Sequence, residues 1–550
     1  MKHVAAFAFG AAILLSSCAP KPPTFDTYRL SAEVKTLSSD AFEGRAPDTP
    51  GEIKTVEYIT REFTDAGLSP GGDMKDGKRT WTQAVPLGRF EITGPVKIAV
   101  HIGGETVPWT QGEQIAVRAA MNGATSVRVD NVPLVFVGYG VDAPERNWDD
   151  YKGVDLKGKI GIVLVNDPDF ETGKGDFGGK AMTYYGRWTY KYEEAARQGA
   201  LGYIVIHETA PAAYGWATVK NSNSITIFDI VREDPTKEHA PLEAWVQRDV
   251  VVDLFKRAGL DFDKAKAEAQ TRAFKPVELK GVTFSADADV DHKTIVSKNV
   301  VGVVPGTDRA DEYVLYTSHW DHLGVGPADA NGDTIYNGAS DNAAGTAGLI
   351  ELGRAFAKGP KPKRTIVFAS VTAEEKGLLG SEYYAANPVY PLGKTAININ
   401  MDGLSLNGPT KNVVAIGQGM SNVDTWMEAA VKAGGQVVSP DPRPEAGSFF
   451  RSDQFSLAKR GVPAMYAKGG QDMVTGGPEA GKAMADDYIA KRYHQPDDEF
   501  NPAWNYDGAK KDLALQYAVG RAIADSGDWP EWNAGAEFKA ARDASAADRK

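Results

Sequence analysis

Apolar and polar residues alternate along this chain in a way that predicts several buried strands, each followed by a polar turn. The clearest example is the stretch 312–402, in which the apolar runs 314–316, 365–369 and 396–400 each end at polar residues. Segment 338–342 opens a helix between the first two runs. Strands that alternate with helices are typical of α/β folds. The pattern predicts a mixed, mainly parallel central sheet flanked by helices.

Helical spacing of apolar residues appears on both sides of this stretch. It predicts a helix over about 30–37, a second helix that opens after residues 50–51 and ends at Gly67, and a last helix near 511–524. Glycine is a good residue just past a helix end. Short strands are expected from 81 to about 117. The charged, Ala-rich residues after about 530 indicate a frayed helix or tail.

The pattern changes near residue 125. Buried strands are predicted at 132–137, 160–165 and 201–206, with a short helix at 190–199. These segments predict a compact, β-rich module over about 125–280. The run Lys191-Tyr192-Glu193-Glu194-Ala195-Ala196-Arg197-Gln198-Gly199-Ala200-Leu201-Gly202 resembles the protease-associated domain that is inserted in several exported peptidases. The alternative is a generic β insert.

The N-terminus has the features of an export signal. Lys2 provides a positive charge, and residues 4–15 form an apolar run too short to span a bilayer as a helix. The run stops at Leu15-Ser16-Ser17-Cys18, which resembles the lipobox of bacterial lipoproteins, in which the Cys is lipidated. A plain secretory signal cut near Ala19 is the alternative. Either reading predicts an exported, periplasmic protein, and the lipobox predicts an anchor in the outer membrane.

Composition narrows the possible functions. A chain of 550 residues is too long for a single core and predicts at least two domains. The net charge of −12 argues against a nucleic-acid-binding surface. Cys18 is the only cysteine, so no internal disulfide is expected. Any membrane contact is expected only through the N-terminal lipid. No feature specifies an oligomeric state.

Metal-binding side chains follow the apolar runs. His319, Asp321 and His322 follow the first, Glu374 and Glu375 the second, and Asp402 the third; Asp341 lies at the start of the predicted helix and His494 in a later loop. Ligands bind outside the carboxyl ends of strands in open α/β sheets. Zinc binds His nitrogen and carboxylate oxygen, and two metal ions can act together on one substrate. The sequence therefore predicts a metal site at this edge of the sheet.

Five motifs in order resemble the co-catalytic di-zinc aminopeptidases, a family that also includes glutamate carboxypeptidases, glutaminyl cyclases and the transferrin receptor. The motifs are His319-x-Asp321, Ser340-Asp341-Asn342 with Ala343-Ala344-Gly345, Glu374-Glu375-x-Gly377-x-x-Gly380-Ser381, Asn400-Met401-Asp402 and Tyr493-His494-x-Pro496-x-Asp498. The resemblance covers about 290–525 and the N-terminal helices. One departure is Gln454, where many relatives have His.

The resemblance implies two Zn²⁺ per chain. His319 and Asp402 would hold one ion, Glu375 and His494 the other, and Asp341 would bridge them. Glu374 would be the general base, and Asp321 would orient His319. His322 is the rival ligand in the first motif.

Together these observations predict the following limits: signal peptide 1–17, tether 18–27, N-terminal part of the peptidase domain 28–124, protease-associated insert 125–280, zinc peptidase domain 281–530 and C-terminal tail 531–550. We expect a metallo-aminopeptidase that acts on peptides. A glutamate-type carboxypeptidase is an alternative, with Arg443 and Arg451 as residues for the substrate carboxylate. A glutaminyl cyclase and a non-catalytic binding protein are the others, although all five metal ligands are present. The Phe449-Phe450 pair fits either a substrate pocket or the core.

Overall fold

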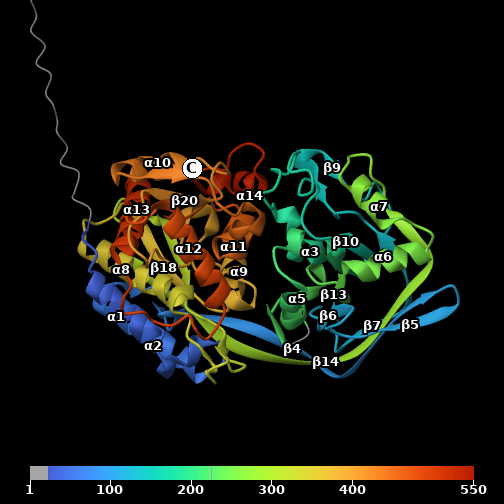
Figure 1. Cartoon of the computed structure of the whole chain (residues 1–550). Helices are drawn as coiled ribbons and strands as arrows, with labels where there is room; N and C mark the ends of the chain where they lie inside the picture. The colour runs from blue at the N-terminus through green and yellow to red at the C-terminus, as the bar shows by residue number, and fades with distance from the viewer. Residues whose placement is uncertain (1–22, 224–225, 550) are drawn as a thin grey trace, which may run out of the picture.

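The computed structural model describes residues 23–223 and 226–549, which form two units side by side above a pair of long strands (Figure 1). We call residues 23–81 and 305–549 the first unit, residues 103–276 the second unit, and the two strands the arm. The predicted signal peptide and Cys18 lie outside the described residues. Among the described helices, none has both the length and the apolar character needed to cross a membrane.

The sheet of the first unit runs in the order β21-β20-β22-β19-β15-β18 and continues into the arm strand β14. The bounds are β15 Arg309–His319, β18 Arg364–Val371, β19 Thr395–Asn400, β20 Asn412–Ile416, β21 Val437–Ser439, β22 Ala464–Gly469 and β14 Val277–Val304. The four strands β22, β19, β15 and β18 are parallel to their neighbours within this group. Strands β14 and β20 join antiparallel. The predicted mixed, mainly parallel sheet is confirmed.

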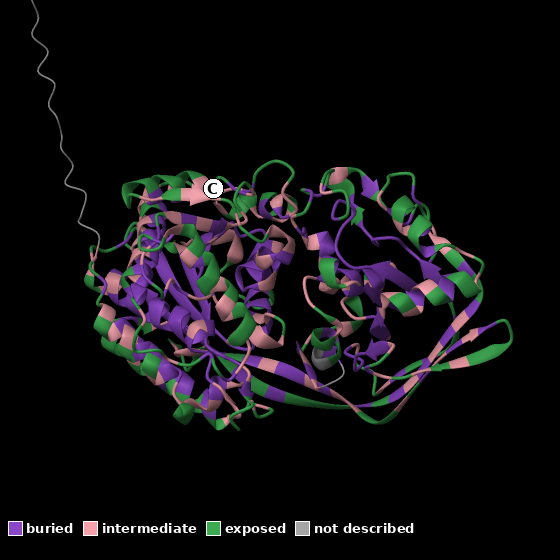
Figure 2. Cartoon of the chain, in the orientation of Figure 1, coloured by how far each residue is buried: buried purple, intermediate pink, exposed green. Residues whose placement is uncertain are grey.

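Helices cover both faces of this sheet. One face packs on α1 Thr27–Leu37, α2 Pro50–Ala66, α8 Ala344–Lys358, α10 Val423–Ala433 and α13 Asp507–Asp525. The other packs on α9 Leu379–Ala386 and α11 Gln454–Lys459. Alternate strand residues supply the two cores, because successive side chains point to opposite faces. For example, Tyr316 belongs to the first core and Leu315 to the second. Figure 2 shows the strands of both units as largely buried.

The second unit has its own sheet, β7-β10-β11-β13-β6, of which β7, β10, β11 and β13 are parallel. The strands span β6 Ile115–Val117, β7 Ser126–Phe136, β10 Ile160–Leu164, β11 Gly202–His207 and β13 Leu242–Gln247; the helices include α3 Trp188–Arg197, α5 Trp216–Asn223, α6 Arg248–Arg257 and α7 Phe262–Ala269. The unit is therefore itself α/β, with more helix than the β-rich pattern indicated.

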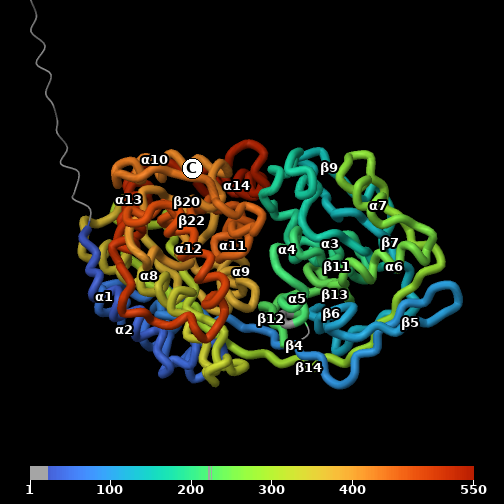
Figure 3. Tube along the Cα trace, in the orientation of Figure 1, coloured from blue at the N-terminus to red at the C-terminus, as the bar shows by residue number. Residues whose placement is uncertain are grey.

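The arm joins the two units into one sheet. Strand β4 Thr82–Ile102 pairs antiparallel with β14 along almost its whole length, and both run beneath the two units (Figure 3). Strand β5 Glu105–Trp109 and strand β12 Ile227–Ile230 pair with β4. Core residues of the second unit begin at Phe90. Sequence reasoning had expected short strands here and had started the insert at 125.

The end of the chain packs against the first unit instead of fraying. Helix α14 Lys539–Ala544 carries Arg542, which is buried and donates hydrogen bonds to the backbone oxygens of Thr395 and Pro530. Trp532 and Phe538 are buried in a cluster with Phe455. These aromatic residues supply the apolar surface that the Ala-rich pattern did not indicate.

Candidate metal centre

Three neighbouring parallel strands bring the predicted ligands to one edge of the sheet. Strand β15 lies between β18 and β19 and ends at His319. Strand β18 ends at Val371, shortly before Glu374, and β19 ends two residues before Asp402. Because Thr317 pairs with residues of both neighbouring strands, the three carboxyl ends are level with one another. The site is thus built from strand ends, as the sequence pattern indicates.

The two histidines contact opposite oxygens of one carboxylate. His319 Nε2 lies 3.3 Å from Asp341 Oδ1 and 3.5 Å from Asp402 Oδ1. His494 Nε2 lies 3.3 Å from Asp341 Oδ2 and 3.2 Å from Glu375 Oε2. Asp341 therefore divides the cluster into two halves, each with one imidazole and one further carboxylate.

This donor set fits zinc. His319 Nε2 is buried and has no hydrogen-bond partner among the described residues, although carboxylates surround it. Ligand atoms of His319, Asp341 and Glu375 lie within 4.8 Å of one another, and those of His319, Glu374 and Asp402 do so too. Imidazole nitrogen and carboxylate oxygen are the usual ligands of catalytic zinc.

The electrostatics of the cluster favour a bound cation. Burial alone would lower the pKa of His319, but the carboxylates of Glu374, Asp341 and Asp402 outweigh it and raise that pKa well above its usual value. Against the same effect of burial, Glu375 and Asp341 raise the pKa of His494 to about 9. The acidic cluster thus holds protons on both imidazoles, and a metal ion would have to displace them.

Asp321 orients the loop that carries the two glutamates. Its carboxylate accepts hydrogen bonds from the backbone N–H of Glu374 at 3.0 Å and of Glu375 at 3.3 Å. Its backbone oxygen lies 3.1 Å from His319 Nδ1, whereas its carboxylate is 3.8 Å from that atom. A bond from Nδ1–H to this oxygen leaves Nε2 free to bind a metal.

His322 lies behind Glu375. Its Nδ1 is 2.7 Å from Glu375 Oε1, the oxygen that does not contact His494. The ring is fully buried. In this position His322 supports Glu375, the residue that reaches the centre.

Two residues near the centre were missed as contributors by sequence reasoning. Asp498 accepts hydrogen bonds from the backbone N–H of Ser340 and Asp341 and so fixes the start of the bridging residue. Its place in the Tyr493-His494 motif was the signal that could have found it. Arg45 is fully buried and donates to backbone oxygens beside the ligands. Its contacts lie far away in the sequence, and no local pattern marks them.

Glu374 is buried and faces the same cluster. Burial, with the nearby carboxylates of Glu375 and Asp402, raises its pKa well above the usual value even though His319 opposes the shift. A carboxyl group with a raised pKa can both accept and return a proton near neutral pH.

The loop that departs from the family pattern has a structural role. Gln454 is buried, accepts a hydrogen bond from Asn400 Nδ2 at 2.8 Å and donates to the backbone oxygen of Phe449 at 2.6 Å. It braces the end of β19. Phe449 and Phe450 are each 5% exposed and belong to an apolar cluster, which places this pair in the core.

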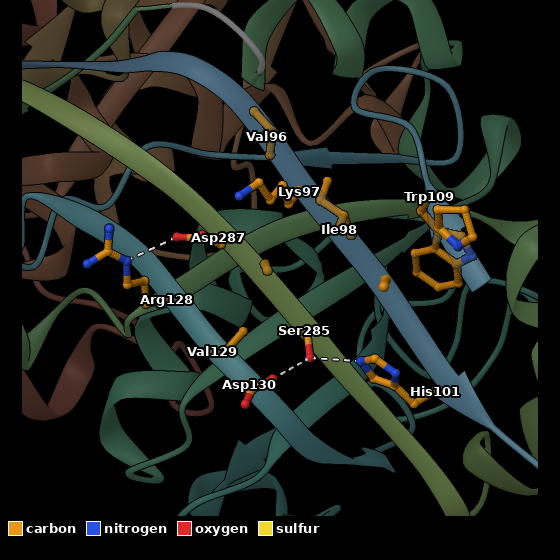
Figure 4. A pocket seen from close by; sticks show the side chains of 13 residues that line it. Val96, Lys97, Ile98, His101, Trp109, Arg128, Val129, Asp130, Ser285 and Asp287 are labelled. Atoms are coloured by element: carbon orange, nitrogen blue, oxygen red, sulfur yellow. Dashed lines mark hydrogen bonds and ion pairs between the residues drawn. The ribbon is translucent and has the colours of Figure 1, made fainter. Parts of the chain in front are cut away.

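A hollow of about 660 Å³ lies on the arm, away from the metal cluster (Figure 4). There Ser285 Oγ lies 3.0 Å from His101 Nε2 and donates to Asp130 Oδ1 at 3.1 Å. The other nitrogen of His101 contacts Thr106. In a serine-hydrolase triad the carboxylate orients the histidine and the hydroxyl donates to that histidine. This polar chain has a different order, so it supplies no nucleophile.

Comparisons with known proteins agree with the motifs. Residues 299–518 match the family described as "Peptidase family M28". A "Probable zinc metalloprotease" of Pyrenophora teres f. teres (strain 0-1) is 40% identical over 103 residues, which cover 19% of this chain and 22% of that protein. A "Glutamate carboxypeptidase 2 homolog" of Caenorhabditis elegans is 30% identical over 206 residues, covering 36% and 24%. The matches thus span about a quarter of these relatives' length.

Among solved structures, an aminopeptidase from Aneurinibacillus sp. strain AM-1 aligns over 91% of this chain and 93% of its own, with 19% identity and a TM-score of 0.47.

Proposed function

We propose that this chain, whose residues 299–518 belong to peptidase family M28, is a zinc exopeptidase that removes N-terminal residues from peptides. The observation that carries the proposal is Asp341, whose two oxygens each face a different histidine. A carboxylate shared in this way is what a pair of metal ions requires. His319 and Asp402 would hold one ion, and Glu375 and His494 the other.

Two zinc ions bound there would polarise the scissile carbonyl and lower the pKa of a bound water. Glu374 accepts the proton of that water through its side-chain oxygen. As the peptide C–N bond breaks, Glu374 returns the proton to the leaving nitrogen. Its raised pKa suits both steps, and the hydrogen bond from its backbone to Asp321 keeps its carboxylate beside the ligands.

A glutamate-type carboxypeptidase is the second candidate, favoured by two arginines near the centre. Arg451 donates to Tyr493 Oη at 3.5 Å, and the Tyr493 ring stacks on His494 with 3.9 Å between the ring centres. Arg187 of the second unit has a buried Nε with no partner among the described residues. Neither arginine has a carboxylate partner within 4 Å in the described part of the chain, so a substrate carboxylate could pair with them.

The test is metal content by elemental analysis of the signal-free protein, together with hydrolysis of aminoacyl-nitroanilides before and after chelation. About two zinc ions per chain and chelator-sensitive release from unblocked substrates support the aminopeptidase. Cleavage only of N-blocked peptides with a C-terminal glutamate would replace it with the carboxypeptidase. A protein that binds no zinc and cleaves neither class would overturn both.

Export belongs to the same proposal. Residues 1–17 would direct the chain to the periplasm, and a lipid on Cys18 would hold it at the outer membrane. Cys18→Ser is then expected to move the protein from the membrane fraction to the soluble periplasmic fraction. Recovery of both forms in the soluble fraction would leave only the secretory signal.

A further inference from the structure

Arg45 is a fully buried guanidinium that bonds only to backbone oxygens. Its Nε donates to Trp320 O at 2.8 Å, and its Nη2 donates to Gly338 O at 2.9 Å. Its Nη1 donates to both Leu37 O at 2.7 Å and Asn337 O at 2.6 Å. No carboxylate in the described ranges lies within ion-pair distance of it. A buried charge without a carboxylate partner is costly, so a specific reason for keeping it is expected.

The acceptors of these bonds explain what Arg45 does. Trp320 lies between His319 and Asp321, so the bond to its oxygen fixes the end of β15. Gly338 lies three residues before Asp341, so the bond to its oxygen fixes the approach to the bridging carboxylate. One guanidinium thus ties the backbone beside one metal ligand to the backbone beside another.

The loop that delivers Arg45 has an unusual backbone. Glu43, Gly44 and Arg45 have φ values of 51°, 64° and 53°, all in the left-handed region. A Cβ at Gly44 would lie 2.5 Å from the backbone oxygen of Tyr336 and 2.6 Å from that of Gly324, so only glycine fits. Backbone in this region costs of order 1 kcal/mol or more per non-glycine residue, and such strain is concentrated at functional sites.

Arg45 is also a fixed positive charge beside the acidic cluster. Burial lowers its pKa to about 10, while Asp321, Asp498 and Asp341 oppose that shift. The guanidinium therefore remains charged at neutral pH. It offsets part of the repulsion among carboxylates that must stay close together when no metal is bound.

We propose that Arg45 is a positioning residue for the metal centre, which sets the separation of His319 and Asp341 through their backbone. This inference rests on the proposed zinc function. It makes the N-terminal segment part of the working site, although that segment contributes no ligand. Lysine cannot replace Arg45, because one ammonium with three donors cannot span four oxygens that a planar fork reaches.

The test compares Arg45→Lys with Arg542→Lys. Arg542 is a matched control because it is also buried and also donates to backbone oxygens, those of Thr395 and Pro530, away from the cluster. Zinc affinity is measured by competition with a chelator, and kcat and KM are measured on the best substrate at saturating zinc. Melting temperatures identify any general loss of stability in each variant.

We expect Arg45→Lys to lose at least about tenfold in zinc affinity, the low end for residues that orient ligands, and to lower kcat with little change in KM. Arg542→Lys should lower the melting temperature alone. Arg45→Gln, which keeps two donors, replaces Arg45→Lys if the lysine variant does not fold. Equal zinc affinity and kcat in the Arg45 and Arg542 variants would overturn the inference. A parent protein that binds no zinc would instead show that the proposed function itself fails.

Discussion

His322 Nδ1 lies 2.7 Å from Oε1 of Glu375, so only the other oxygen of this carboxylate is left to face the metal cluster. That oxygen, Oε2, is 3.2 Å from His494 Nε2. The contact restricts Glu375 to a single ligating oxygen and keeps the carboxylate in one orientation. Residues that orient metal ligands affect metal affinity strongly.

Replacing His322 should therefore weaken zinc binding without removing a ligand. We expect His322→Ala to lower zinc affinity by about 10–100-fold, measured by chelator competition. His101→Ala is the control, because His101 lies on the arm and hydrogen-bonds only to Thr106 and Ser285. Unchanged affinity in both variants would show that Glu375 keeps its orientation without His322.

Glu374→Gln separates a base from a ligand. If Glu374 only transfers protons, the variant should lose about 10²–10⁴-fold in kcat and keep both zinc ions. The Glu374 oxygens also lie within 4.8 Å of the ligand atoms of His319 and Asp402. Loss of one zinc ion per chain, seen by elemental analysis, would therefore assign Glu374 to the metal.

Zinc affinity should rise with pH up to about 9. In the metal-free protein the pKa of His494 is raised to about 9, and the pKa of His319 is raised well above its usual value. Both imidazoles are then protonated at pH 7 and must lose these protons to bind zinc. Calorimetric titration in buffers of different ionisation enthalpy should detect proton release at pH 7. Binding with no proton release would contradict the assignment of these two ligands.

A pH effect on stability is expected far from the metal. His239 lies 2.7 Å from Glu243 Oε1 and 3.0 Å from Asp229 Oδ2. Burial opposes protonation, but the two carboxylates raise the pKa of His239 from 6.5 to about 10. Because the folded-state pKa is raised, the stabilisation is complete below pH 6.5 and is lost as the pH rises to 10.

The loss corresponds to at most about 5 kcal/mol in the free energy of unfolding. We expect His239→Gln to be much less stable than the parent at pH 6.5 and to approach it at pH 10, in urea unfolding experiments on metal-free protein. A constant difference between the two proteins across this range would contradict the charged state of His239.

Sequence reasoning found the sheet of the first unit because its strands are continuous apolar runs that end at ligands. The helix that ends at Gly67 was found for a local reason too, since this glycine has φ 93° as the cap of α2. The spacing of His319, Asp341, Glu375, Asp402 and His494 marked residues that the structure brings together.

Other features depend on contacts distant in sequence. The direction of His322 Nδ1 follows from turn geometry that spacing does not encode. The bonds of Arg45 reach residues at least 275 positions away, apart from Leu37. The alternating pattern of residues 82–102 fits several short strands as well as one long strand, and only the partner β14 decides between them.

The arm has a consequence for how the protein could be divided. Strand β14 pairs with β18 in the first unit, with β7 in the second, and with β4 between them. A linker of flexible chain would let each half be expressed alone, but here the boundary is a continuous hydrogen-bonded ribbon. Excising 125–280 would remove the start of β14 and leave much of β4 as an unpaired edge exposed to aggregation. A truncation that retains 82–102 and 282–304, joined by a short hairpin turn, would keep the ribbon intact.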